Sequence, residues 1–165
     1  MKTIYLAGGC FWGVEAYFKK LKGVVDTQVG YANGNYPNPT YEEVCDEKAT
    51  HAEAVKVVYD EKVISLEKLL EHLFRIIDPT SVNKQGHDEG VQYRTGVYFE
   101  TPEEEKIARA YAAYRQPEFK KPIAVEIQSL RGFYDAETYH QDYLDKNPFG
   151  YCHVNFAVLK KEEMK

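Results

Sequence analysis

The spacing of apolar residues along the chain predicts strands and helices that alternate in similar number. Apolar runs typical of strands cover residues 4–7, 24–31, 52–59, 96–100 and 123–130. Helical spacing or helix-capping residues predict helices over residues 10–22, 41–45, 65–77, 102–116 and 135–146. Because several connections are short, we expect an α+β fold, a two-layer α/β sandwich with a mixed sheet, rather than a doubly wound sheet.

The pattern runs along the whole chain without an internal repeat, a low-complexity segment or a linker. At 165 residues the chain is long enough to bury one core, so we expect a single domain, 1–165, with a short charged tail from about residue 157. A turn-rich loop covers residues 78–90, and a loop of that length in a compact domain is usually functional or disordered. Asp88 and Tyr93 fall at or just beyond it, where turn capping and a functional role are equally good interpretations.

Composition and charge narrow the function classes. The net charge of −5 gives no support to nucleic-acid binding. No apolar run approaches the roughly 20 residues of a membrane span, and Gly8-Gly9 interrupts the first run before it reaches the length of a signal core. The three cysteines form an odd set without close pairing, which argues against a disulfide framework and for a reducing compartment. We therefore expect a cytoplasmic monomer.

Cys10 is the most informative of the three cysteines. It follows a predicted strand and the turn Gly8-Gly9, and it stands in the first turn of a predicted helix, before Phe11 and Trp12. Unpaired N–H groups at a helix start stabilise an anion, so we expect a thiol pKa below the free value near 8.5. The alternative is a small side chain packed under the helix, but two adjacent bulky aromatics cannot both face a core at successive helical positions.

Glu53 departs from the pattern of its predicted strand. It shares one face with Val55, Val57 and Tyr59, so its carboxyl group is expected to be partly desolvated. Desolvation would raise its pKa toward neutrality and allow it to carry a proton. The alternative is a carboxylate at the strand end, in solvent or paired with a lysine.

The histidines offer further chemistry but no clear partner. His51 or His140 could activate a thiol, although nothing nearby in the sequence orients either ring. His72 interrupts the polar side of the leucine-rich helix and is expected at the surface. The pair Cys152-His153 lacks the doubled spacing of a zinc site, so no metal and no cofactor are expected.

Several motifs together resemble one family. The run Gly8-Gly9-Cys10-Phe11-Trp12-Gly13 resembles the signature of the peptide methionine sulfoxide reductase A family. Further matches follow in the family's order: Gly30-Tyr31, Pro39-Thr40-Tyr41-Glu42-Glu43-Val44-Cys45, His51-Ala52-Glu53-Ala54-Val55, Asp78-Pro79-Thr80, Gln92-Tyr93-Arg94, Ala136-Glu137-Thr138-Tyr139-His140-Gln141 and Asn147-Pro148-Phe149-Gly150-Tyr151-Cys152. The resemblance spans roughly residues 3–156.

The resemblance implies a ferredoxin-like α/β core and reduction of the S epimer of methionine sulfoxide, free or peptide-bound. Matching the motifs residue by residue gives each site residue an expected role: Cys10 as nucleophile, Phe11 and Trp12 as the apolar wall for the substrate methyl group, Glu53 as general acid, Tyr41 and Tyr93 as hydrogen-bond donors to the sulfoxide oxygen, Asp88 as a supporting residue and Cys152 as the recycling cysteine. Thioredoxin, or another dithiol, is the implied reductant.

The chain departs from the family pattern after Cys152. Many members continue into a glycine-rich tail with another cysteine, and here residues 153–165 contain none. A single exchange between Cys10 and Cys152 is therefore the expected cycle. Cys45 lies in a short acidic helix, which disfavours a thiolate, and is interpreted as structural.

Two other functions stay open at this point. One is a cysteine acyl-transfer hydrolase that pairs Cys10 with His51 or His140. The other is a non-enzymatic redox-sensing or sulfoxide-binding module, in which Phe11 and Trp12 hold a partner and no methionine is released.

Overall fold

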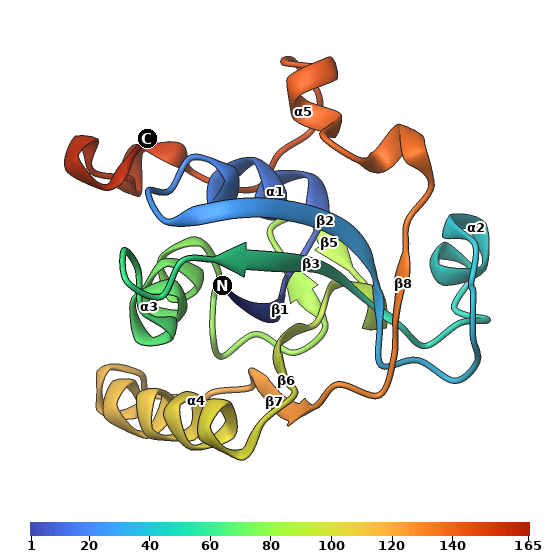
Figure 1. Cartoon of the computed structure of the whole chain (residues 1–165). Helices are drawn as coiled ribbons and strands as arrows, with labels where there is room; N and C mark the ends of the chain where they lie inside the picture. Colours follow the sequence, from blue (N-terminus) through green and yellow to red (C-terminus); the bar gives the residue numbers. More distant parts are fainter.

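A six-stranded mixed sheet forms the centre of the molecule (Figure 1). The structure is a computed structural model, and it describes residues 1–165. The sheet order is β7-β6-β1-β3-β2-β8, and every neighbouring pair is antiparallel except β6 and β7. The strands are β1 (Lys2–Gly8), β2 (Val24–Ala32), β3 (Ala52–Tyr59), β6 (Thr95–Phe99), β7 (Glu126–Ser129) and β8 (Phe133–Asp135). The predicted α+β class and mixed sheet are confirmed.

Two of the helices each connect a pair of parallel strands in the centre of the sheet. The helix α1 (Phe11–Lys19) lies between β1 and β2 in the chain, and α3 (Leu66–Ile76) lies between β3 and β6. Because β3 separates β1 from β2, and β1 separates β3 from β6, each helix crosses between parallel strands that are not direct neighbours. The remaining helices are α2 (Tyr41–Cys45), α4 (Pro102–Arg115) and α5 (Tyr143–Lys146).

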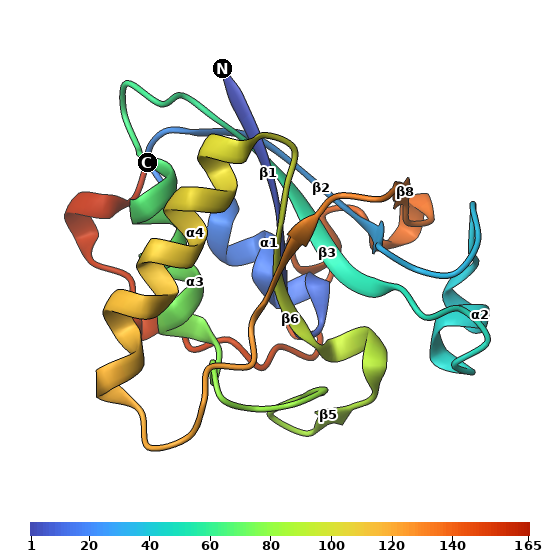
Figure 2. The same cartoon turned by 90° about the horizontal axis from the view of Figure 1, so that it is seen from below.

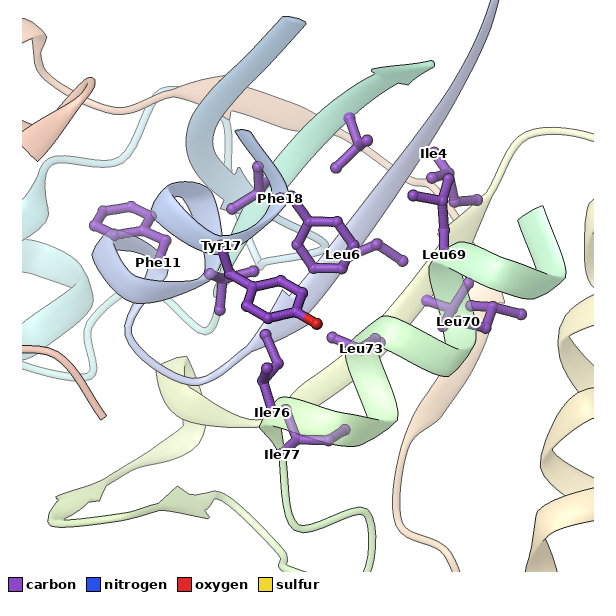
Figure 3. Close-up of a cluster of buried hydrophobic side chains, with 14 of the residues drawn as sticks. Ile4, Leu6, Phe11, Tyr17, Phe18, Leu69, Leu70, Leu73, Ile76 and Ile77 are labelled. Atoms are coloured by element: carbon purple, nitrogen blue, oxygen red, sulfur yellow. The ribbon is translucent and has the colours of Figure 1, made fainter. Parts of the chain in front are cut away.

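The main core lies between the sheet and the helices α1 and α3. Figure 3 shows Ile4 and Leu6 of β1 together with aromatic side chains of α1 and leucines of α3. Ile4, Leu6 and Phe18 are fully buried. Figure 2 shows α4 on the outer side of α3, at the edge of the sheet formed by β6 and β7. This core fixes the start of α1 against the sheet.

Local capping signals place two helices as predicted. The Thr40 hydroxyl accepts from the Glu43 N–H at the start of α2, and Thr101 does the same for Glu104 at the start of α4. In both cases the glutamate side chain returns a bond to the N-cap amide, which completes a capping box. Such bonds are made within four residues, so they can be predicted from the sequence.

The predicted helix over 135–146 is wrong. This segment contains the end of β8, a short 3-10 turn (Thr138–His140) and the four-residue helix α5. Tertiary bonds override helix propensity here: the Gln141 side chain pairs with the Val29 backbone, and Asp142 adopts φ +55°. The loop 78–90 likewise contains a short hairpin, β4 (Lys84–Gln85) with β5 (Asp88–Glu89).

The end of the chain packs against the body of the protein. The charged tail includes two 3-10 turns, Phe156–Val158 and Lys161–Glu163, and Met164 forms an antiparallel bridge with Leu21 (Figure 1). The predicted surface position of His72 is also wrong. Its side chain is 1% exposed beneath this tail, and its ring nitrogen Nδ1 shares a hydrogen bond with the Tyr17 hydroxyl. None of the helices is long and apolar enough to cross a membrane.

Candidate active site

Cys10 lies at the junction between β1 and α1. It is the N-cap residue of α1, and its side chain is 7% exposed. Gly9 makes the turn with φ +89°, and a Cβ at that position would come within 2.8 Å of the Gln85 side chain. The backbone therefore requires glycine immediately before the thiol, both for its conformation and for space.

The pKa of Cys10 differs from the sequence prediction. A pKa below the free value was expected from the helix start, and the Trp12 N–H does act in that direction. Burial of the thiol is the larger influence and raises its pKa, and the charge of Glu53 raises it further. The prediction of a lowered thiol pKa is therefore wrong, because desolvation outweighs the helix terminus. Cys10 is a neutral thiol at rest.

Glu53 projects from β3 toward the start of α1. Its side chain is 1% exposed, and Oε1 accepts a 3.2 Å hydrogen bond from the Phe11 N–H. The other oxygen, Oε2, is buried without a partner. Burial, followed by the charge of Asp88, raises the pKa of Glu53 to about 8, although the Phe11 bond opposes this shift. The carboxyl group is therefore protonated at neutral pH, with one oxygen free to donate.

Phe11 and Trp12 form an aromatic wall beside the thiol. Phe11 is buried, and its ring lies 5.7 Å from the Tyr31 ring between centroids. Trp12 is half-buried and stacks on Tyr143 at 3.8 Å. Its Nε1–H donates a 3.0 Å hydrogen bond to His140 Nδ1, which fixes the direction of the indole. His140 and Tyr143 thus support the wall from the segment that the sequence predicted as one helix.

Two tyrosines approach the carboxyl group from different elements. Tyr41 opens α2, and Tyr93 ends the 3-10 turn Val91–Tyr93. Both are half-buried; burial raises the pKa of each phenol, and the nearby Glu53 charge raises it further. The two hydroxyls are therefore protonated donors over the whole neutral range. Their position follows from the capped start of α2 and from the loop after β5.

Asp88 of β5 lies on the same side of the site. It is half-buried, its Oδ2 has no hydrogen-bond partner, and its charge acts on the pKa of Cys10, Glu53 and Tyr93. Burial, and then the nearby Asp88 carboxylate, raises the pKa of the Tyr151 phenol to about 12. The structure thus brings Asp88 together with the thiol, the acid and one phenol.

Cys152 packs against the first turn of α1, near Cys10. A Cβ added at Gly13 would lie 2.8 Å from the Cys152 Sγ and 2.9 Å from Val154. Gly13 lies in the first turn of α1, which Cys10 caps, and the charge of Cys152 is among the influences that raise the pKa of Cys10. Cys152 is half-buried, all three cysteines are free thiols, and burial raises the Cys152 pKa.

The remaining candidates lie outside this arrangement or play other parts in it. His51 is buried between the rings of Tyr36 and Tyr134. The charges that shift the pKa of Cys10 come from Glu53, Asp88 and Cys152, and none of these is a histidine. Cys45 is exposed at the end of α2, and partial burial of its thiol raises its pKa although the nearby Tyr41 phenol opposes this shift. No group of three or more possible metal ligands occurs.

Some site residues escaped prediction from the sequence. The sequence indicates His140 only as a possible thiol activator, and Tyr31 and Glu137 only as parts of motifs. In the structure, Glu137 accepts from the Tyr31 hydroxyl at 2.9 Å and from the Tyr41 N–H at 3.0 Å. Glu137 therefore ties the start of α2 to β2, a contact between distant segments that no local pattern reveals.

Comparison with known proteins gives one consistent result. The family model "Peptide methionine sulfoxide reductase" matches residues 2–165. The chain is 54% identical over 161 residues to peptide methionine sulfoxide reductase MsrA of Clostridium acetobutylicum, covering 98% of this chain and 99% of that one.

Solved structures agree with the sequence relatives. Reduced Mxr1 from Saccharomyces cerevisiae superposes with a TM-score of 0.88 at 42% identity, covering 93% of this chain and 91% of that one. Mxr1 in complex with Trx2 superposes with a TM-score of 0.62 at 33% identity, covering 86% of this chain and 84% of that one.

Proposed function

The chain belongs to the peptide methionine sulfoxide reductase family and is an oxidoreductase; on that premise we propose that it reduces the S epimer of methionine sulfoxide, free or in peptides. One observation carries the proposal: a buried, protonated Glu53 with an unpartnered oxygen lies beside the Cys10 thiol. A sulfoxide is a poor electrophile until its oxygen is protonated or strongly hydrogen bonded. The site therefore pairs the nucleophile with the acid that this substrate needs.

In the proposed first step, the hydroxyl made from the sulfoxide oxygen passes to the Cys10 sulfur. Glu53 gives its proton to the sulfoxide oxygen, with Tyr41 and Tyr93 as further donors, while the Cys10 sulfur attacks the sulfoxide sulfur. The thiol proton then returns to the Glu53 carboxylate. The S–S bond formed by the attack and the S–O bond of the substrate both break, and an S–O bond forms at Cys10. Methionine leaves with two more electrons on its sulfur, and Cys10 becomes a sulfenic acid, the reversible first stage of cysteine oxidation.

The aromatic wall explains how the substrate would be held. We assign the substrate methyl group to the apolar surface of Phe11 and Trp12, which lies at the start of α1 next to the thiol. The bond from Trp12 to His140 and the stacking on Tyr143 keep this surface in place. Asp88 would support the site beside Tyr93, where its Oδ2 is free to hold a water molecule.

In the proposed second step, Cys152 regenerates the nucleophile. Its sulfur attacks the Cys10 sulfenic acid, a disulfide forms, and the oxygen leaves as water. A thioredoxin then reduces the disulfide by thiol exchange. The complex of the relative Mxr1 with Trx2 supports this choice of reductant, and the cysteine usage supports a cytoplasmic location.

Two finer interpretations of the fold go with this proposal. We interpret β1-α1-β2-β3-α3-β6 as a ferredoxin-like core, because its sheet order and crossovers are those of a split βαβ motif. We also interpret residues 1–165 as one catalytic domain, since the tail packs on α1 and α3.

The decisive test uses both sulfoxide diastereomers with dithiothreitol as reductant. Only the S form should disappear, and the C10S variant should form no methionine. Consumption of neither form would refute the proposal, and consumption of the R form would refute the assigned stereochemistry. A hydrolase would instead show a burst with activated esters, and a binding module would retain the sulfoxide unchanged.

A further inference from the structure

The last residues of the chain, 153–165, cross the molecule over α1 and α3; we call them the C-terminal strap (Figure 1). Backbone bonds fix its end: the Lys22 N–H donates to the Glu163 carbonyl at 2.9 Å, and the Lys165 N–H donates to the Lys20 carbonyl at 2.9 Å. The strap is therefore joined to the residues that follow α1.

One carboxylate anchors the strap to α3. Arg75 grips Glu163 with two bonds, 2.7 Å from Nη1 to Oε1 and 3.0 Å from Nη2 to Oε2, and the Lys160 N–H adds a third at 3.0 Å. The Glu163 side chain is 11% exposed. The hydrogen bond from Arg75 is the largest influence that lowers the Glu163 pKa, to about 2, so the carboxylate stays charged at neutral pH.

The same carboxylate connects to α1 through a buried histidine. His72 Nδ1 lies 2.7 Å from the Tyr17 hydroxyl, and His72 Nε2 lies 3.6 Å from Glu163 Oε2. Burial lowers the pKa of His72 to about 4, so the ring is neutral. With Nδ1 accepting from Tyr17, the Nε2–H faces the carboxylate. Figure 3 shows the Tyr17 hydroxyl directed toward α3.

The other end of the strap begins directly after Cys152. His153 Nε2 lies 2.7 Å from the Gly8 carbonyl, and Val154 is 7% exposed in the main core. The Cys152 Sγ rests against Gly13, as described above. The thiol is thus held between α1 and the first residues of the strap, and the strap is held at its far end by Glu163.

We propose that Glu163 and Arg75 are positioning residues for recycling: their ion pair fixes the C-terminal strap and so keeps the Cys152 thiol against the first turn of α1, next to Cys10. The inference rests on the proposed function, because it concerns disulfide formation. In that step the Cys152 sulfur bonds to the Cys10 sulfur, the S–O bond of the sulfenic acid breaks, and the Cys152 proton leaves with the oxygen as water. The sulfoxide substrate has already supplied the oxidising equivalents.

The test separates recycling from sulfoxide reduction. Wild type, E163Q and R75Q each receive one equivalent of sulfoxide without a reductant, and mass spectrometry follows the conversion of sulfenic acid into disulfide. We expect both variants to form the disulfide more slowly by about tenfold or more, since a misplacement of about 1 Å can lower the rate of an oriented reaction ~10²-fold. Methionine formation should stay as in wild type. Turnover with dithiothreitol should also be unchanged, because that reagent reduces the sulfenic acid directly.

Glu162 provides a matched control, because it is the exposed neighbour of Glu163 and E162Q removes the same charge. E162Q should form the disulfide at the wild-type rate. Wild-type rates in E163Q and R75Q, or an equal fall in dithiothreitol-driven turnover, would overturn the positioning role. No methionine from the wild type would instead reject the proposed function.

Hydrogen exchange of the wild type tests the anchor without any variant. The amides of Lys22 and Lys165 should be protected, because they donate to the strap and to the residues after α1. Exchange of both at the rate of an unstructured chain would refute an anchored strap even if the variants fail to fold.

Discussion

Replacing Glu53 by glutamine should slow the enzyme and stabilise the fold at the same time. The substitution keeps an acceptor for the Phe11 N–H and places an amide where Oε2 has no partner. It removes the transferable proton, so sulfoxide reduction should fall by about 10²–10⁴-fold, the range for loss of a general acid.

The stability change follows from the pKa. Glu53 ionises near 8 in the folded protein, against an ordinary value of 4.5. A raised carboxyl pKa contributes stability that is present below pH 4.5 and is lost as pH rises toward 8. Each pH unit in that window costs about 1.4 kcal/mol, so at neutral pH the wild type carries a penalty of about 3 kcal/mol that the glutamine variant avoids.

Two measurements check this reasoning. Single-turnover methionine formation gives the rate, and urea unfolding at several pH values between 4.5 and 8 gives the free energy of unfolding. The difference in stability between E53Q and wild type should grow with pH across that window. A rate close to that of wild type, or a stability difference independent of pH, would refute the assignment of a buried proton donor. E15Q serves as the control for the rate measurement. Glu15 is also a buried carboxyl, but its contacts are with Thr27 and Asp142 rather than with the thiol.

Three further predictions concern the residues around the nucleophile. C152S should release one methionine per enzyme when no small thiol is present, and steady turnover of that variant with thioredoxin alone would exclude the recycling role. G13A should slow disulfide formation more than methionine formation, because its Cβ would lie 2.8 Å from the Cys152 Sγ. Mass spectrometry measures both steps, and an equal fold-reduction of the two rates relative to wild type would contradict this. H140F should raise KM and shift the fluorescence of Trp12, the single tryptophan, because the indole loses its acceptor; an unchanged spectrum would show that His140 does not orient it.

Sequence reasoning succeeded where the relevant interactions are local. The capping boxes at Thr40 and Thr101 are made within four residues, and each helix starts where its cap predicts. The alternation along residues 52–59 placed Glu53 on a valine face, and the carboxyl group is buried there. Both inferences need only the period of the element and the chemistry of one residue.

Prediction from the sequence failed where contacts between distant segments determine the secondary structure or the burial of a residue. The segment 135–146 pairs with β2 through Asp135, opposite Gly30, and through the Gln141 side chain, so no single helix forms. His72 appears polar in its helix, but the C-terminal strap covers it. The packing around Gly9, the residue before Cys10, involves residues far along the chain, among them Gln85 and His153.

The neutral state of the Cys10 thiol has a consequence for how the protein survives the conditions under which its substrate forms. Peroxides attack thiolates far more readily than thiols, and repeated attack drives cysteine to sulfinic and sulfonic acids. A thiol whose pKa is raised by burial offers such oxidants little anion to react with. Selectivity against irreversible damage would thus arise from the same desolvation that keeps the acid protonated.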